Sequence, residues 1–140
     1  MRVVLDTNVL IAAALKGGLA DQILRLATSR QLSLIISQEI LEELSEKLLS
    51  KFTWKDGEVS LYIETLKEIS EIVSPSKKLD VISKDPDDNK ILEAALEGRA
   101  ELIVSIDQDL LKLKKYKDIG IIHPKTLTWI LPKLFEGNKK

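Results

Sequence analysis

Short, nearly continuous apolar runs alternate along this chain with longer segments in which apolar residues recur at helical spacing, and this alternation limits the fold more than any other feature. The runs at 2–5, 32–36, 102–106 and 119–122 consist mainly of Val, Leu and Ile. Strands of this composition are typical of parallel sheets that helices cover on both faces. We therefore expect an α/β fold, a three-layer α/β/α sandwich with a central parallel sheet of four or five strands.

The segments between these runs carry helix signals. Ser37 is a good N-cap for a helix over 38–50. Another helix is expected over about 58–69, followed by a short edge strand at 72–73. The helix over 85–97 opens on Asp-Pro, which favours the N-cap and the first helical position, and a Gly follows its end. Further helices are predicted over 9–15, 23–30, after 107 and after 124.

The chain has 140 residues, a length that fits one domain and leaves no room for two full cores, so we expect a single domain over 1–140. Its longest apolar run, at 9–15, is far shorter than the roughly 20 residues that cross a bilayer. Acidic and polar residues precede that run where a signal peptide has basic ones. Because cysteine is also absent, we expect a cytoplasmic protein that does not contact membranes.

Two aspartates directly follow predicted strands. Asp6 ends the first apolar run and Asp107 ends the most hydrophobic one. If both strands are central and parallel, these carboxylates emerge at the same edge of the sheet, where ligands bind in folds of this kind. The alternative for each is a helix cap, because Asp often caps the helix that follows a strand.

Two further acids are expected at the same edge. Asp85, Asp87 and Asp88 place more negative charge at one helix start than the helix dipole can stabilise. We select Asp88 because the residues three and seven positions later are apolar and should face inward. On the helix over 38–50, Glu43 is the acid closest to the margin of the apolar stripe, although a surface glutamate is the alternative there.

Four carboxylates that meet within a few ångströms repel one another and require a cation. The chain has one His and no Cys, so oxygen ligands are expected, which favour Mg²⁺ or Mn²⁺ over Zn²⁺. The net charge of −1 excludes a globally basic surface for nucleic acid. Without the four acids, however, the other residues carry a charge of about +3. An acidic metal site on a mildly basic body suits a phosphodiester substrate.

Other polar residues near these acids have two interpretations each. Asn8 and Ser105 can orient the carboxylates through hydrogen bonds or serve ordinary turns. A basic run after Asp107 either contacts substrate phosphates or forms a solvated face. It comprises Lys112, Lys114, Lys115 and Lys117. We interpret His123 as a turn residue, and Trp54 and Trp129 as packing anchors.

Four stretches occur in the order in which the PIN domain family has its motifs. They are Leu5-Asp6-Thr7-Asn8-Val9-Leu10, Ser37 with Glu42-Glu43-Leu44, Asp85-Pro86-Asp87-Asp88-Asn89, and Val104-Ser105-Ile106-Asp107-Gln108-Asp109-Leu110-Leu111. Together they resemble that family over nearly the whole chain. The last two stretches are most similar to the branch of VapC-type toxin ribonucleases from toxin-antitoxin pairs.

The resemblance implies a metal-dependent ribonuclease that hydrolyses RNA phosphodiester bonds with metal-activated water. Its acidic set falls on Asp6, Glu43, Asp88 and Asp107. Asn8 and Ser105 match polar supports of the family, although Ser105 stands where Thr is common, and Asp109 matches an acid that can assist. The resemblance further implies a homodimer and a small antitoxin protein that blocks the site.

Three other functions make different demands on the sequence. A haloacid-dehalogenase-like phosphatase needs a second Asp two residues after Asp6, where this chain has Asn8. A receiver-like phosphoacceptor domain needs an acid pair after the first strand, and only Asp6 is present there. A catalytically weak PIN-like module that binds RNA or protein remains open, because an acidic set shows capacity and not turnover.

Overall fold

A computed structural model describes residues 1–82 and 86–136 of the chain. These residues form one sheet with the strand order β3-β2-β1-β4-β6-β5. The strands are β1 (Arg2–Leu5), β2 (Ser33–Ser37), β3 (Ser70–Val73), β4 (Leu102–Val104), β5 (Lys115–Tyr116) and β6 (Ile119–Ile122). The first five strands in that order are parallel, and β5 pairs with β6 in the antiparallel sense. The parallel sheet is thus confirmed.

The predicted parallel sheet of four or five strands is confirmed, since five of the strands are parallel, and a sixth strand in the described part of the chain joins the edge in the antiparallel sense. The additional strand is β5, which has only two residues. It lies at the edge of the sheet and has no apolar run. The pattern of hydrophobic residues in the sequence therefore could not predict this strand.

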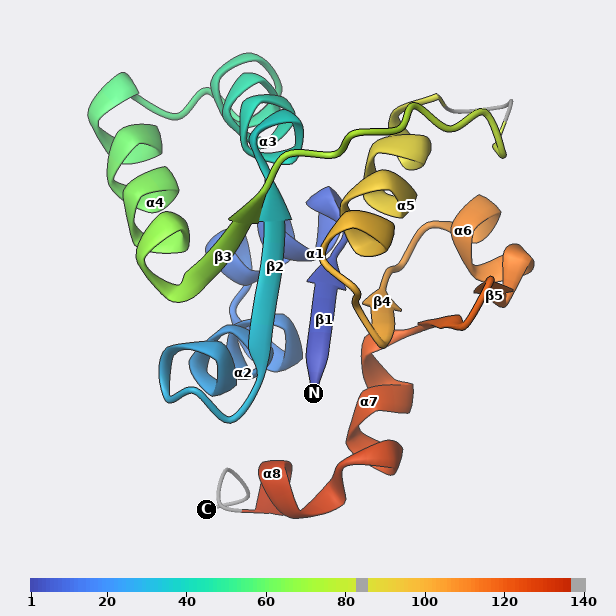
Figure 1. Cartoon of the computed structure of the whole chain (residues 1–140). Helices are drawn as coiled ribbons and strands as arrows, with labels where there is room; N and C mark the ends of the chain where they lie inside the picture. Colours follow the sequence, from blue (N-terminus) through green and yellow to red (C-terminus); the bar gives the residue numbers. More distant parts are fainter. Residues whose placement is uncertain (83–85, 137–140) are drawn as a thin grey trace.

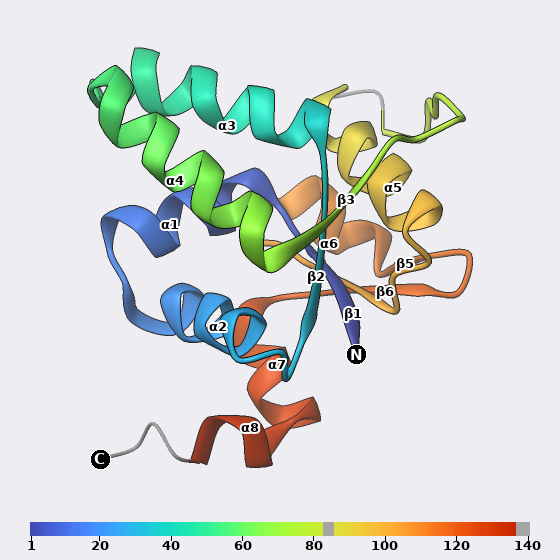
Figure 2. The ribbon, with the colours of Figure 1, turned by 60° about the vertical axis from the view of Figure 1, so that its left-hand side comes forward.

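Helices lie on both sides of this sheet. They are α1 (Thr7–Leu15), α2 (Gly18–Thr28), α3 (Gln38–Ser50), α4 (Asp56–Ile69), α5 (Asp87–Glu97), α6 (Gln108–Leu113), α7 (Pro124–Ile130) and α8 (Pro132–Glu136). In Figures 1 and 2, α5 covers one face while α1 and α2 lie behind the other, which gives the three layers of the sandwich. No helix among the described residues has the length and apolar character needed to pass through a bilayer.

The core explains why the strands read as continuous apolar runs. β1 lies between β2 and β4, and residues such as Val4, Ile35 and Ile103 are at most 1% exposed. Gly98, the C-cap of α5, allows the helix end to approach β2 closely. A Cβ at this position would lie 2.5 Å from Cγ2 of Ile35, too close for any side chain. The close approach fixes α5 against the central strands.

Side chains of α5 hold the segment that connects β3 to this helix. Oδ1 of Asn89 accepts hydrogen bonds from the amides of Val81 and Ile82, both at 2.9 Å, and its Nδ2 donates to the carbonyl of Ile82 at 2.7 Å. One turn later, Oε2 of Glu93 accepts from the amide of Leu79 at 2.8 Å. These bonds therefore fix the described part of the connection, up to residue 82, against α5, and its course can be followed in Figure 1.

Several local predictions can be compared with this structure. Ser37 caps α3 by accepting a hydrogen bond from the amide of Ile40, as expected. His123 has the turn role expected of it, because its Nδ1 accepts from the amide of Lys125 at the start of α7. The predicted N-cap Asp85 lies outside the described residues, and α5 begins at Asp87.

The two tryptophans differ. Trp54 packs against the core, with its ring centroid 6.1 Å from that of Tyr62, as predicted. Trp129 is 77% exposed, so its interpretation as a packing anchor is wrong. It lies near the end of the short helix α7, where only one side of the helix contacts the body of the protein.

Candidate metal centre

The candidate site lies at the carboxyl ends of two adjacent parallel strands. Asp6 directly follows β1, and Asp107 follows β4 after two intervening residues. The amide of Asp6 donates a hydrogen bond to the carbonyl of Val104 at 2.9 Å, which ties the two strand ends together. The two aspartates thus emerge at the same edge of the sheet, as their positions in the sequence predicted.

Ser105 connects these two aspartates. Its hydroxyl donates to Oδ2 of Asp6 at 2.8 Å and accepts from the amide of Asp107 at 2.9 Å. Ser105 is fully buried and Asp6 is only 4% exposed. The supporting role expected for Ser105 therefore has a concrete geometry, in which one hydroxyl sets the orientation of one carboxylate and the backbone position of the other.

Three carboxylates gather beside this bridge. Asp88, Asp107 and Asp109 each place one oxygen within 4.8 Å of the others. Asp88 is buried in the first turn of α5, while Asp107 and Asp109 are half-buried. Oδ1 of Asp107 also accepts hydrogen bonds from the amides of Asp109 and Leu110, so this side chain caps α6 as well. Asp109, expected only to assist, belongs to the same group as Asp88 and Asp107.

The pKa of Asp6 shows how these charges interact. Burial raises it above the ordinary value for aspartate, and the negative charge of Asp107 raises it further. The hydrogen bond from Ser105 acts in the opposite direction, because it stabilises the ionised form. Asp6 is therefore a buried carboxylate beside a like charge, a situation that a bound cation would relieve.

Glu43 reaches the same region from α3. Its Oε2 accepts a hydrogen bond from the hydroxyl of Thr7 at 2.9 Å. Its Oε1 is buried and has no hydrogen-bond partner within residues 1–82 and 86–136. Burial raises the pKa of Glu43, with the Thr7 hydrogen bond and Lys47 lowering it. Neither Glu43 nor Asp6 belongs to the group of three carboxylates described above, judged over the same residues.

Thr7 is a site residue that the sequence did not reveal. It is 2% exposed in the first turn of α1, and its hydroxyl links that helix to α3. The available signal was its position directly after Asp6 in the first motif. Nothing in the sequence pairs it with a glutamate that lies 36 residues away.

The remaining predicted site residues lie on the surface. Asn8 is exposed, and its side chain forms no hydrogen bond with any described residue. The basic run is exposed at the end of α6 and the start of the following hairpin. Its members named as substrate contacts are Lys112, Lys114 and Lys115. Their contact with a substrate remains a prediction.

The donor set fits a hard divalent cation. All the candidate ligands are carboxylate oxygens, which Mg²⁺ and Mn²⁺ prefer. The orphaned Oε1 of Glu43 and the raised pKa of Asp6 both indicate that the protein alone does not satisfy these two acids beside the group of three carboxylates. The residues present therefore fit the cation expected from the sequence.

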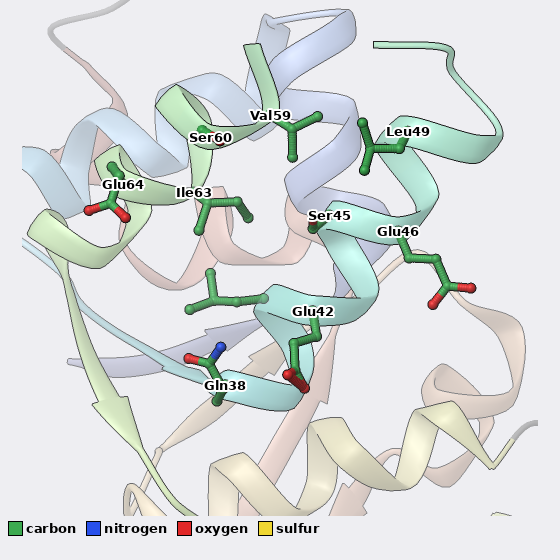
Figure 3. Close-up of a pocket in the computed structure, with 10 residues that line it drawn as sticks. Gln38, Glu42, Ser45, Glu46, Leu49, Val59, Ser60, Ile63 and Glu64 are labelled. Carbon is green, nitrogen blue, oxygen red and sulfur yellow. The ribbon is translucent and has the colours of Figure 1, made fainter. Parts of the chain in front are cut away.

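A pocket elsewhere on the protein is separate from these acids. It lies between α3 and α4 and has a volume of about 480 Å³ (Figure 3). Leu41, Val59 and Ile63 supply apolar surface, while Glu42 and Glu46 lie along it. None of the four predicted acids lines this pocket.

Comparison with known proteins agrees with this geometry. The family model of the PIN domain matches residues 2–109, a range that contains all of the acids discussed above. The fold is similar to a chain in the crystal structure of VapBC2 from Rickettsia felis bound to a DNA fragment from their promoter. That match has a TM-score of 0.63 and 19% identity, and it covers 86% of this chain and 97% of that chain. No curated protein matched. The family model spans most of the sequence and the fold agrees with it, and the chain therefore belongs to the PIN domain family.

Proposed function

We propose that this protein is a metal-dependent endoribonuclease that hydrolyses RNA phosphodiester bonds, and that residues 1–140 act as a single PIN-like domain. The observation that carries the proposal is the clustering of Asp88, Asp107 and Asp109 within 4.8 Å, beside a buried Asp6 that Ser105 holds. Membership of a family of nucleases supports the reaction class. The RNA substrate is part of the proposal.

Asp6, Glu43, Asp88 and Asp107 are the proposed ligands of Mg²⁺ or Mn²⁺. Asp6 and Asp107 would bind directly, while Asp88 and Glu43 complete the sphere, directly or through water. Asp109 lies close enough to assist. A divalent cation at this position supplies positive charge for the phosphoryl oxygens and makes water more acidic for in-line attack.

The protein itself orients and shields the reacting groups. Ser105 fixes the carboxylate of Asp6, and Thr7 fixes that of Glu43, so both acids are held before a substrate arrives. The burial of Asp6 excludes bulk water from one side of the cluster. The exposed lysines of the basic run are proposed to contact phosphates. They are Lys112, Lys114 and Lys115.

We further propose that the protein is the toxin of a toxin-antitoxin pair. The fold similarity to a chain in the structure of VapBC2 bound to a DNA fragment supports an antitoxin partner. A homodimer and a cytoplasmic location belong to the same proposal. In this role, the partner protein would control access to the carboxylate cluster.

Cleavage of labelled single-stranded RNA tests the proposal. The wild type should cut RNA in Mn²⁺, EDTA should stop the reaction, and Asp6→Asn should reduce its rate by about 100-fold or more. Asp56→Asn is the matched control, because Asp56 is exposed on α4 and changes the same charge. This variant should cut as fast as the wild type.

Three results would contradict the nuclease proposal. Equal cleavage by wild type and Asp6→Asn would mean that the activity comes from a contaminant. Binding of RNA with steep salt dependence, but without cleavage in Mn²⁺ or Mg²⁺, would instead identify a binding module with the same fold. Labelling of one aspartate by acetyl phosphate would favour a phosphoacceptor domain.

A further inference from the structure

A smaller pocket lies at the carboxyl end of α5, away from the carboxylate cluster. It has a volume of about 230 Å³, and three separate segments of the chain line it. Each segment contributes one cation. Lys77 comes from the connection after β3, Arg99 follows α5, and Lys117 lies in the turn between β5 and β6. Residues far apart in the sequence thus bring three positive charges to one hollow.

These three cations have no carboxylate partners. All three residues are exposed, and none forms an ion pair within the described part of the chain. The ammonium of Lys117 lies 5.6 Å from the ring centroid of Tyr116, which is a cation–π contact with a neutral ring. Their charge is therefore available to an anion.

The two acids of the pocket hydrogen-bond to the segment that carries Lys77, while Oε1 of Glu93 is buried and has no hydrogen-bond partner among the described residues. Oε1 of Glu97 accepts hydrogen bonds from the amide and the hydroxyl of Ser76, at 3.0 and 3.1 Å. Glu93 is 5% exposed, and its Oε2 binds the amide of Leu79. These carboxylates hold the segment that carries Lys77 in place. They do not form ion pairs with the three cations.

Two of the cations occupy positions that their backbone disfavours. Arg99 has φ of 53° and Lys117 has φ of 54°, both in the left-handed region. Arg99 follows the C-cap Gly98, at the position where helices usually place glycine. Residues other than glycine rarely adopt this left-handed backbone conformation. An observed outlier of this kind is a reason to look for a function.

We propose that Lys77, Arg99 and Lys117 form a subsite for the phosphate backbone of single-stranded RNA. The inference rests on the proposed function, because RNA is the substrate class proposed there. Arg99 lies just beyond α5, whose first turn carries Asp88, so the subsite is about 15 Å from the carboxylate cluster along the helix.

A cationic subsite away from the carboxylates would offset the weak attraction of this protein for RNA. The chain has a net charge of −1, and its site is a cluster of carboxylates, so a polyanion is not attracted by the molecule as a whole. Cations gathered at one place can hold the strand beyond the point of cleavage. Each phosphate that they neutralise releases counterions and makes binding depend on salt.

The test measures binding of fluorescently labelled single-stranded RNA by anisotropy in EDTA, between 50 and 200 mM KCl, so that binding is read without cleavage. The triple variant Lys77→Gln, Arg99→Gln, Lys117→Gln should bind at least 10-fold more weakly at 50 mM KCl. The slope of log affinity against log salt should become shallower by about 2, since each single-strand phosphate contact contributes roughly 0.7.

A matched control separates the subsite from net charge. The triple variant Lys16→Gln, Arg30→Gln, Lys51→Gln also removes two Lys and one Arg, but from exposed positions elsewhere on the protein. Arg30, like Arg99, has a positive φ. It should keep the wild-type salt slope and lose less than 3-fold in affinity. An equal loss in both triple variants would overturn the proposal.

Substitutions at Arg99 separate RNA binding from stability. Arg99→Gly should raise the melting temperature, because glycine accepts the left-handed backbone, yet it should weaken RNA binding about 3-fold. Arg99→Lys should keep the affinity. Unchanged affinity and salt slope in Arg99→Gly would refute a role in binding.

The outcome is distinguishable from that of the proposed function. If the wild type does not bind RNA in EDTA, the subsite is refuted even if Mn²⁺-dependent cleavage occurs. If RNA binding depends on the three cations but no cleavage occurs in Mn²⁺, the nuclease proposal fails and the subsite stands.

Discussion

Replacing Ser105 with alanine removes the hydroxyl that joins Asp6 to Asp107. The bond to the Asp6 carboxylate has a charged acceptor, which contributes about 1.5–3 kcal/mol, and the bond from the Asp107 amide contributes about 0.5–1.5 kcal/mol. Because Ser105 is fully buried, water cannot replace either bond. The free energy of unfolding should therefore fall by about 3 kcal/mol at pH 7.5, roughly 100-fold in the unfolding equilibrium.

Urea denaturation in EDTA measures this loss, and its pH dependence identifies the bond to Asp6. The hydroxyl lowers the pKa of Asp6 by stabilising the ionised form, so its removal raises that pKa further. The extra stability of the wild type over Ser105→Ala is then fully present above both pKa values. It diminishes as the pH falls through them and Asp6 becomes protonated.

A double-mutant cycle with Asp6→Asn provides the control. In the Asn background, the Ser105 hydroxyl meets a neutral acceptor, so Ser105→Ala should be less destabilising by about 1–2 kcal/mol. The reasoning is refuted if Ser105→Ala costs less than about 1 kcal/mol at pH 7.5, or if the loss is the same in both backgrounds and at both pH extremes.

Three further predictions follow from the described contacts. Asn89→Ala removes three hydrogen bonds, two of them buried, so it should lower the free energy of unfolding by about 3 kcal/mol and speed amide exchange at Val81 and Ile82; slow exchange in the variant would contradict this. Asp6 has a raised pKa in the folded state, which means that stability is lost as the pH rises through it. In EDTA, Asp6→Asn should therefore be more stable than the wild type at pH 7.5, with a difference that disappears below pH 3.8. Mn²⁺ at 100 times its dissociation constant should stabilise the wild type by about 2.7 kcal/mol in thermal or urea unfolding, and Asp88→Asn by much less at the same concentration.

The sequence predicted those features that depend on burial along a single element. The runs in β1, β2 and β4 are apolar at almost every position because both faces of the sheet are covered, and this pattern needs no knowledge of the partners. Asp6 and Asp107 were placed together by the same logic, since parallel neighbours end at one edge. In contrast, β5 is a two-residue edge strand defined only by its pairing with β6.

The features that were missed are contacts between side chains of different elements. The Thr7–Glu43 hydrogen bond needs α1 and α3 at a definite distance and orientation, which periodicity does not specify. Asn89 appeared in the sequence only as part of an acidic motif, but its amide binds the backbone of residues 81 and 82. Trp129 shows the opposite error, because a large apolar side chain does not by itself imply a neighbour to bury it.

The connection between β3 and α5 is held in a way that has an evolutionary consequence. Asn89, Glu93 and Glu97 are spaced four residues apart on α5, and they form hydrogen bonds mainly with main-chain groups of the connection. Main-chain groups are the same whatever the residue, so most side chains there can be exchanged without altering the path. Related proteins can therefore differ in the surface side chains of this connection while α5 and the path of the connection stay the same.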